Sequence, residues 1–363
     1  MTILKNKKKP YFKLRRIVAR IIIAIIILSL LLFLCRGLIK KASIYMSNSD
    51  HKKLISAFYS IDYGNEEVED IINKLKESNK VSKVDSDMVK ELSIKGYNKN
   101  TINFIVLNMS KTQIRKLLNK KYDKDFEEYL TIKLFNYENY NRYLEYQEEH
   151  KDMSLEDIVI RVELNQDLYN YENSVLIDNP DSYTTLVNRH RYISKDYIPS
   201  DLVDMEDKYS NNSRSTNKVR KEVYEQFKKM VDDAKEDGIT FYAEKAYRSF
   251  DDQDDIYYEY LNINGSEMTS KYAAKAGYSE HQLGTAIDIA NNWYIDEGDK
   301  EYKWIEKFGY IYGFILRYKS KEEDITGYAA EGCHIRYVGI DVATKIHKEN
   351  ISFDEYWIKN IKK

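Results

Sequence analysis

Two of the chain's six histidines lie in segments whose neighbouring residues could hold a metal ion. His281 precedes Asp288 by seven positions, and His334 follows Glu331 by three. Imidazole nitrogens and carboxylate oxygens are ligands of Zn²⁺, and a catalytic zinc site uses three protein ligands and leaves the fourth position to water. We therefore consider His281, Asp288 and His334 as ligands, with Glu331 close enough to reach the metal-bound water.

These residue types together describe hydrolysis by an activated water. Zinc lowers the pKa of its bound water to about 7, which makes hydroxide available at neutral pH. Glu331 would accept the water proton and pass it to the departing amine. The charge that develops on the attacked carbonyl needs a positive group nearby. Arg248, which follows an expected strand, is the candidate.

On the residues alone, a second interpretation stays open. A histidine followed seven positions later by an aspartate is a common spacing, and a surface histidine with a capping aspartate shows it too. The small number of histidines makes chance clustering less frequent and favours the metal site. We expect the four other histidines at the surface, because they lack carboxylates at useful spacing: His51, His150, His190 and His347.

The backbone must bend to bring the candidate ligands together. His281 and Asp288 are an odd number of positions apart, so a simple strand would point them to opposite faces. Gly284, between them, offers a bend or bulge. Cys333 could compete for the metal as a thiolate, but adjacent residues of an extended backbone point apart. We expect Cys333 to be a small apolar filler.

Glycine content separates a helical region from a mixed one. Residues 42–172 contain only two glycines and no proline, which predicts an all-α region. A stripe within it, capped by Asn100 or Thr101, has helical spacing: Ile102, Ile105, Val106 and Met109.

The glycine-rich region reads differently. Residues 238–363 contain ten of the thirteen glycines. An amphipathic helix before Gly238, a strand at 239–243 and further glycine turns predict an α+β domain. We place this domain at residues 183–363.

The N-terminus has the pattern of a membrane anchor. Residues 21–35 carry no charge, and flanking apolar residues extend this run to a span at 17–39. Eight basic residues precede the run, and residues 1–16 form a basic tail that stays in the cytoplasm by the positive-inside rule. We expect a single-pass protein of the cell membrane, with 42–172 as an extracellular spacer domain and the catalytic domain also outside. A cleavable signal peptide would need small residues at a cleavage site after the apolar run, and the sequence there offers none that fits well. A lipoprotein would need a small residue directly before Cys35, and Leu34 is not small.

Charge and cysteine content exclude other classes. Residues 1–41 hold eleven basic side chains and no acid, so the rest of the chain holds 46 basic and 59 acidic ones. That balance argues against a nucleic-acid partner. Cys35 and Cys333 are the only cysteines, which excludes a disulfide-stapled scaffold.

The motifs resemble those of a known family over about residues 183–350. They are similar to the zinc D-alanyl-D-alanine carboxypeptidases of the VanY type, which share a fold with lysostaphin-type peptidases and the hedgehog signalling domain. The resemblance rests on these segments: Leu186–Asn188, Tyr197–Val203, Ala246–Phe250 with Gln253, Gly277–Asp288, Gly313–Arg317, Ile325–Tyr328 and Glu331–Gly339.

The resemblance implies a small antiparallel sheet flanked by helices, and a role for each matching residue. His281, Asp288 and His334 would bind Zn²⁺, Glu331 would be the general base, and Arg248 would hold the oxyanion. Ser279 and Gln253 match positions near the substrate, with either a binding or a structural role. The implied activity removes the terminal D-alanine from peptidoglycan stem peptides that end in D-Ala-D-Ala.

One departure from the family pattern keeps two alternatives open. The family usually has a proline and a tryptophan between the glutamate and the histidine, where this chain has Gly332 and Cys333. The loss of a rigid, bulky wall could widen the substrate range or lower the activity. A peptidoglycan endopeptidase on the same scaffold and a non-catalytic cell-wall-binding module are the alternatives.

Overall fold

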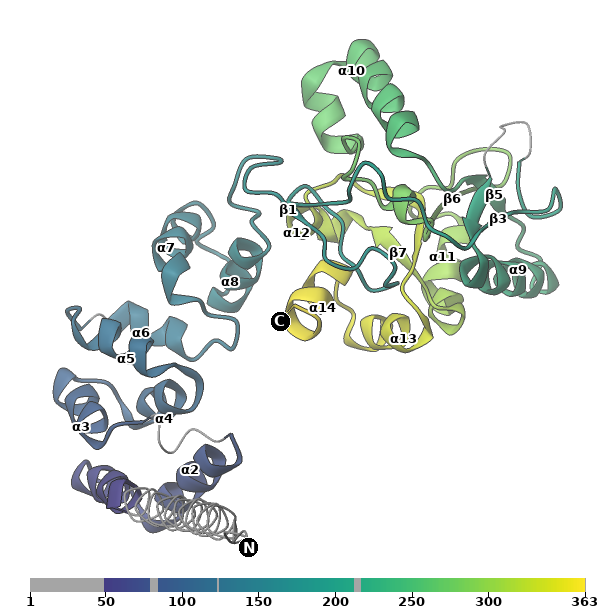
Figure 1. Ribbon diagram of the computed structural model, residues 1–363. Coiled ribbons are helices and arrows are strands. Elements are labelled where there is room, and N and C mark those ends of the chain that lie inside the picture. The colour runs from purple at the N-terminus through teal and green to yellow at the C-terminus, as the bar shows by residue number, and fades with distance from the viewer. Residues whose placement is uncertain (1–48, 79–83, 123, 212–216, 363) are drawn as a thin grey trace, which may run out of the picture. The chain divides into compact units, whose positions relative to one another are not determined.

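The computed structural model describes residues 49–362, apart from 79–83, 123 and 212–216 (Figure 1). Contacts within the chain divide it into two compact units, the first ending at Lys133 and the second beginning at Leu134. The expected membrane anchor, residues 17–39, lies outside the described residues. Among the helices that the structure does describe, none is long and apolar enough to cross a membrane.

The described part of the first unit consists of short helices. Residues 49–60 are helical, and the helices that follow are α2 (Asn65–Glu77), α3 (Ser86–Lys95), α4 (Lys99–Asn108), α5 (Lys111–Leu118) and α6 (Lys124–Leu130). Three residues of the predicted stripe are buried on α4: Ile102, Ile105 and Val106. The cap predicted at Asn100 or Thr101 is wrong, because Asn98 accepts the hydrogen bond from the Thr101 amide at 3.0 Å.

The second unit combines helices with short strands, which confirms the expected α+β class. It begins with η2 (Tyr137–Asn139), α7 (Tyr140–Glu149), α8 (Leu155–Glu163), β1 (Val175–Leu176), β2 (Arg191–Tyr192), β3 (Leu202–Asp204), β4 (Lys218–Arg220), α9 (Lys221–Glu236) and β5 (Tyr242–Lys245). It continues with α10 (Phe250–Tyr272), η3 (Glu280–Leu283), β6 (Ala286–Ala290), α11 (Lys300–Phe308), η4 (Gly309–Tyr312) and β7 (Phe314–Tyr318). It ends with η5 (Ser320–Glu322), α12 (Glu323–Thr326), β8 (Glu331–Tyr337), α13 (Ile340–Glu349) and α14 (Phe353–Asn360).

The main sheet has four antiparallel strands in the order β5-β6-β8-β7. Side chains alternate between its two faces. Ile287 and Ile289 of β6 and Ile335 of β8 point to one face, where they join a core with residues of α9 and α11. Asp288 and His334 therefore lie on the opposite face, which is the face that carries the candidate site.

Helix α9 covers the apolar face of this sheet as its sequence predicts. Four apolar residues at helical spacing are buried on it, as expected of the amphipathic helix before Gly238: Val223, Phe227, Met230 and Ala234. Gly238, two residues beyond the last helical position, adopts a φ of +77°, which favours glycine after a helix. The strand that follows begins at Tyr242 rather than at the expected residue 239.

A second core connects the C-terminal helices to residues that precede the sheet. Ile160 and Leu164, at the end of α8, are buried with Ile315 of β7 and Trp357 of α14. Arg161 of α8 also forms an ion pair with Asp324 at 2.5 Å. The contacts thus group α7 and α8 with the domain that we expected to begin at residue 183. The role of residues 42–172 as an extracellular spacer stays a prediction.

Candidate metal and active site

Neighbouring strands place two of the predicted ligands side by side. Asp288 of β6 and His334 of β8 are direct partners in the antiparallel ladder, so their side chains leave the sheet on the same face. His334 Nδ1 lies 3.0 Å from Asp288 Oδ1. Both side chains are almost fully enclosed, with 5% and 4% of their surface exposed.

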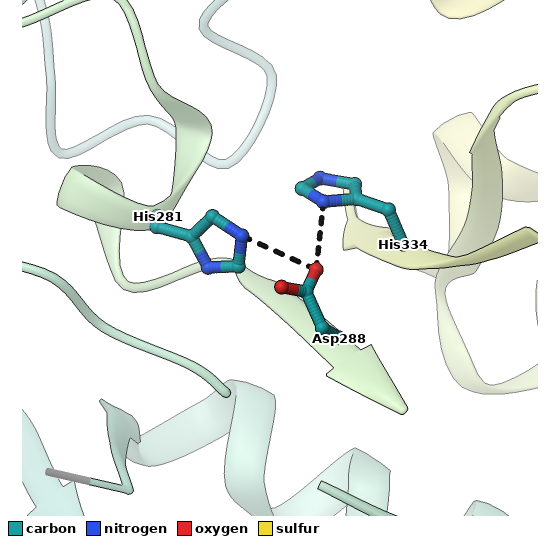
Figure 2. A group of neighbouring side chains, drawn as sticks. All are labelled: His281, Asp288 and His334. Carbon is teal, nitrogen blue, oxygen red and sulfur yellow. Dashed lines mark hydrogen bonds and ion pairs between the residues drawn. The ribbon is translucent and has the colours of Figure 1, made fainter. Parts of the chain in front are cut away.

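The third predicted ligand reaches the same point from a turn. His281 lies in η3, and Gly284 ends this turn with a φ of +65°, which turns the chain into β6. The bend predicted at Gly284 is therefore confirmed. The carbonyl of Ala246 lies 2.6 Å from His281 Nδ1, so Nδ1 forms its hydrogen bond on the side of the ring away from Asp288. His281 Nε2 consequently faces Asp288 Oδ1 at 3.2 Å (Figure 2).

Each of the three residues offers one free ligand atom to a common space. The ligand atoms of His281, Asp288 and His334 lie within 4.8 Å of one another, with Asp288 between the two imidazole rings (Figure 2). The rings are nearly perpendicular, at an interplanar angle of 87° and a centroid distance of 5.0 Å. Two nitrogens and one oxygen in a buried cluster match the donor set of a catalytic zinc site, so these residues fit the metal that the sequence predicts.

Glu331 reaches the cluster because β8 is irregular. Glu331 and His334 are three positions apart, and a regular strand would point them to opposite faces. In the ladder with β7, Leu316 pairs with Ile335 and Tyr318 pairs with Glu331. An advance of two residues along β7 therefore corresponds to four residues along β8, so β8 contains extra residues that form a bulge. This bulge brings Glu331 Oε2 to 3.9 Å from His334 Nδ1, with 42% of the Glu331 side chain still exposed.

Arg248 is held against the metal-site carboxylate. Its Nη2 donates to Asp288 Oδ2 at 2.8 Å, and its Nη1 donates to Gln253 Oε1 at 3.2 Å. Gln253 Nε2 in turn donates to the carbonyl of Ala274 at 2.8 Å. Both ends of the buried Gln253 amide are therefore occupied within the protein, which favours the structural role over substrate binding for this residue.

Ser279 also has a local partner. It caps η3, and its hydroxyl accepts a hydrogen bond from the His281 amide at 3.4 Å. Only 6% of Ser279 is exposed, although it borders the cavity. The contact fixes the start of the turn that presents His281.

The electrostatics of the cluster differ between its two histidines. Burial and the nearby Arg248 lower the pKa of His281 to about 4, so its imidazole is neutral at physiological pH. For His334, burial is outweighed by hydrogen bonds with Asp288 and Glu280, and the pKa rises to about 9. Partial burial and the charge of Asp288 raise the pKa of Glu331 above its ordinary value. A raised pKa makes Glu331 a stronger proton acceptor once it is ionised.

The cluster lies in the wall of a cavity of about 280 Å³. Helix α10, which stands out from the domain as a bent helical hairpin, contributes another part of the wall (Figure 1). Its bend is at Gly265, where φ is +77°. Cations and tyrosines line the cavity beside the predicted site residues: Lys245, Lys271, Tyr260, Tyr272, Tyr318 and Tyr328.

From the sequence, we expect Glu280, next to His281, to be a solvent-exposed or salt-bridge residue rather than a ligand, and the salt bridge is confirmed, since Arg317 Nε lies 2.9 Å from Glu280 Oε1. Sequence reasoning missed the contact of Glu280 with His334. Its side chain is completely enclosed, and it lies 3.4 Å from His334 Nε2. Its place next to His281 was the available signal, but the sequence does not show that His334 turns its second nitrogen toward this position.

Comparison with known proteins agrees with this geometry. The family model VanY, D-alanyl-D-alanine carboxypeptidase, matches residues 216–340. YodJ of Bacillus subtilis (strain 168), which is named as a carboxypeptidase, is 35% identical to this chain over 190 residues. The match covers 50% of this chain and 70% of YodJ. The chain belongs to the VanY family.

Two further similarities involve other carboxypeptidases. The D-alanyl-D-alanine carboxypeptidase of Enterococcus faecium is 34% identical over 177 residues, which cover 47% of this chain and 56% of that protein. The solved structure of the LdcB LD-carboxypeptidase is 32% identical and covers 53% of this chain and 92% of that chain, with a TM-score of 0.48.

The structure gives a physical reason for the glycine where the VanY family usually has proline. A Cβ added at Gly332 would lie 2.7 Å from backbone atoms of Asp296 and of Glu297. The 296–297 backbone therefore approaches β8 at a point that admits no side chain. Next to it, Cys333 is 6% exposed and belongs to the core under the sheet. Its sulfur and the carboxylate oxygens of Asp288 and Glu331 lie within 4.8 Å of one another. Burial raises the pKa of the thiol, however, and so disfavours the thiolate that would bind a metal ion.

Proposed function

We propose that the chain is a zinc-dependent carboxypeptidase that removes the C-terminal D-alanine from peptidoglycan stem peptides. The observation that carries the proposal is the convergence of two imidazoles, one carboxylate, Glu331 and Arg248 on one cavity. Membership of the VanY family supports the reaction class, and the donor set supports zinc.

The ligand roles follow from the free atoms. His281 would bind through Nε2, His334 through Nδ1 and Asp288 through Oδ1, because the other polar atoms of these side chains have protein partners. A zinc ion held there would supply a bound water of lowered pKa and polarise the substrate carbonyl.

The remaining chemistry is assigned to side chains of this protein. Glu331 lies at the mouth of the cluster and would accept a proton from the attacking water, then deliver it to the amine of the departing D-alanine. Arg248 would donate a hydrogen bond to the oxyanion, because its guanidinium borders the cavity next to Asp288. Its pairing with Gln253 restricts the guanidinium to that orientation.

The lining of the cavity supports cleavage at a chain end. A carboxypeptidase must hold the free carboxylate of its substrate, and two lysines line the same cavity as Arg248: Lys245, and Lys271, which also pairs with Glu267 at 3.2 Å. An endopeptidase has no terminal carboxylate to bind at this position. We therefore favour the carboxypeptidase over the endopeptidase on this scaffold.

The proposed location of the enzyme is the outer face of the cell membrane. The uncharged run at 21–35 and the basic residues before it support an anchor at 17–39 with its N-terminus in the cytoplasm. This orientation would present the catalytic domain to peptidoglycan.

The test is a digestion of a stem pentapeptide that ends in D-Ala-D-Ala. The full-length chain, purified in mild detergent, would be loaded with zinc or treated with a chelator, and the products followed by mass. Loss of a single alanine with zinc and no loss after chelation is expected. An internal cut would replace the proposal by the endopeptidase, and an intact peptide in the presence of bound zinc would favour the non-catalytic module. A tetrapeptide in a parallel reaction shows whether an L,D-bond is cut instead.

A further inference from the structure

A buried carboxylate faces the edge of the His334 ring that points away from the predicted metal ion. Glu280 has a fully enclosed side chain, and its Oε2 lies 3.4 Å from His334 Nε2. His334 Nδ1, on the other side of the ring, faces Asp288 at 3.0 Å. The imidazole is thus held between two carboxylates, only one of which belongs to the predicted ligands.

Two buried arginines fix Glu280 in place. Arg317 Nε donates to Glu280 Oε1 at 2.9 Å, and Arg336 Nη1 lies 3.4 Å from the same oxygen. Arg317 also forms an ion pair with Asp354 of α14, at 2.6 Å between Nη1 and Oδ2. All four side chains are fully enclosed. The two positive charges in contact with this enclosed carboxylate favour its ionised form.

The position of Glu280 decides which nitrogen of His334 is available. An ionised carboxylate is an acceptor only, so the nitrogen that faces it must carry the hydrogen. When Nε2 carries the hydrogen in the neutral ring, Nδ1 has the free lone pair, and Nδ1 is the atom that faces Asp288 and Glu331. A hydrogen bond to the second nitrogen also fixes the ring plane, as partners behind metal-bound histidines do in other sites.

We propose that Glu280 is a positioning residue that holds His334 in the tautomer and orientation needed to bind the metal through Nδ1. The inference rests on the proposed function, because it requires His334 to be a ligand. It assigns Arg317 and Arg336 the task of balancing the charges of Glu280 and Asp354 and of immobilising Glu280, and the Arg317–Asp354 ion pair connects the C-terminal helix to the metal site.

The experiment measures metal binding separately from turnover. The full-length chain and its Glu280→Gln and Glu280→Leu variants would be titrated with Zn²⁺ against a competing chelator, and with Co²⁺ while its visible absorption is recorded. Glu280→Gln keeps the side-chain shape and one acceptor oxygen, whereas Glu280→Leu removes every acceptor. We expect affinity to fall about 10-fold in the first variant and up to about 100-fold in the second, with altered Co²⁺ bands.

Glu322→Gln is the matched control. Glu322 is another buried glutamate of the same domain, 6% exposed, and its ion pair is with Lys319 at 3.8 Å. This variant should bind metal like the unchanged chain. Thermal unfolding without metal would show that each variant is folded; if Glu280→Leu is not, Glu280→Gln decides.

The outcomes separate the two proposals. Folded Glu280 variants that bind zinc within twofold of the unchanged chain, with the same Co²⁺ spectrum, would overturn the role of Glu280 while the metal site stands. An unchanged chain that binds no zinc would overturn the proposed function, and this inference with it.

Discussion

Backbone atoms of a neighbouring loop leave no room for a side chain at Gly332, next to the site, and Gly332→Ala tests this restriction. The added Cβ would lie 2.7 Å from backbone atoms of Asp296 and Glu297, about 0.7 Å short of the 3.4 Å at which ordinary contact begins. Both neighbours are backbone, so no side chain can rotate away. The Glu297 side chain accepts a hydrogen bond from the Ser320 amide at 2.8 Å, which ties this loop to the segment after β7, so we expect β8 to shift as well.

The expected effect has a stability part and a site part. Inserting one carbon into a closely packed position costs about 1–3 kcal/mol, and each kcal/mol lowers Tm by about 2–4 °C in a domain of this size. Because the strained position lies in the bulge between Glu331 and His334, we also expect kcat to fall at least about 10-fold, since a misplacement of about 1 Å can cost 100-fold. Calorimetry and peptide hydrolysis measure the two parts.

Gly298→Ala is the control. Gly298 lies in the turn that contains Asp296 and Glu297, opposite Gly332. It has a φ of +98°, and an added Cβ there would have no atom within 4 Å. Its substitution costs about 1 kcal/mol of backbone strain, which is close to the lower limit for Gly332→Ala, but should leave kcat unchanged. Equal activity in both variants, or an unchanged Tm for Gly332→Ala, would refute the argument that this glycine is required by the 296–297 backbone.

Four further predictions concern the metal site. His334→Ala should lose zinc, measured by metal analysis after dialysis; full occupancy would contradict its role as ligand. Because the pKa of His334 is raised to about 9 without metal and that of His281 is lowered to about 4, zinc binding at pH 7 should release about one proton, from His334, measurable by calorimetry in buffers of different ionisation enthalpy. The same raised pKa stabilises the metal-free fold below the unfolded value near 6.5, so its Tm should fall as the pH rises from there through about 9, and a constant Tm would contradict this. Cys333→Ala should keep zinc affinity within twofold, because the buried thiol is protonated; a large loss would make Cys333 a ligand.

His334, which lies 46 positions beyond Asp288, was proposed as the third ligand from its residue type and the resemblance to the VanY family, whereas the bend between His281 and Asp288 could be anticipated because its constraint is local. An odd spacing between His281 and Asp288 requires a bend, and Gly284 was the one residue suited to it. The amphipathic stripe of α9 likewise predicted a buried face, since helical spacing and burial coincide there.

Features that depend on distant contacts could not be anticipated. The bulge that turns Glu331 toward His334 is visible only in the pairing of β8 with β7. His190, expected at the surface, is only 2% exposed, and its Nδ1 is within hydrogen-bond distance of the Glu172 carbonyl, at 2.8 Å. The packing of α8 against α14 similarly joins segments almost 200 residues apart, for which the local sequence carries no signal.

The most direct test of the central claim uses Glu331→Gln in the full-length chain. This change removes the proton acceptor and leaves the three ligand atoms of His281, Asp288 and His334 in place. Metal content and pentapeptide hydrolysis would be measured on the same sample, with Glu349→Gln, at the exposed end of α13, as the control. The account predicts one zinc per chain and a loss of hydrolysis of at least about 100-fold. Hydrolysis at the unchanged rate with zinc bound would show that Glu331 is not the base.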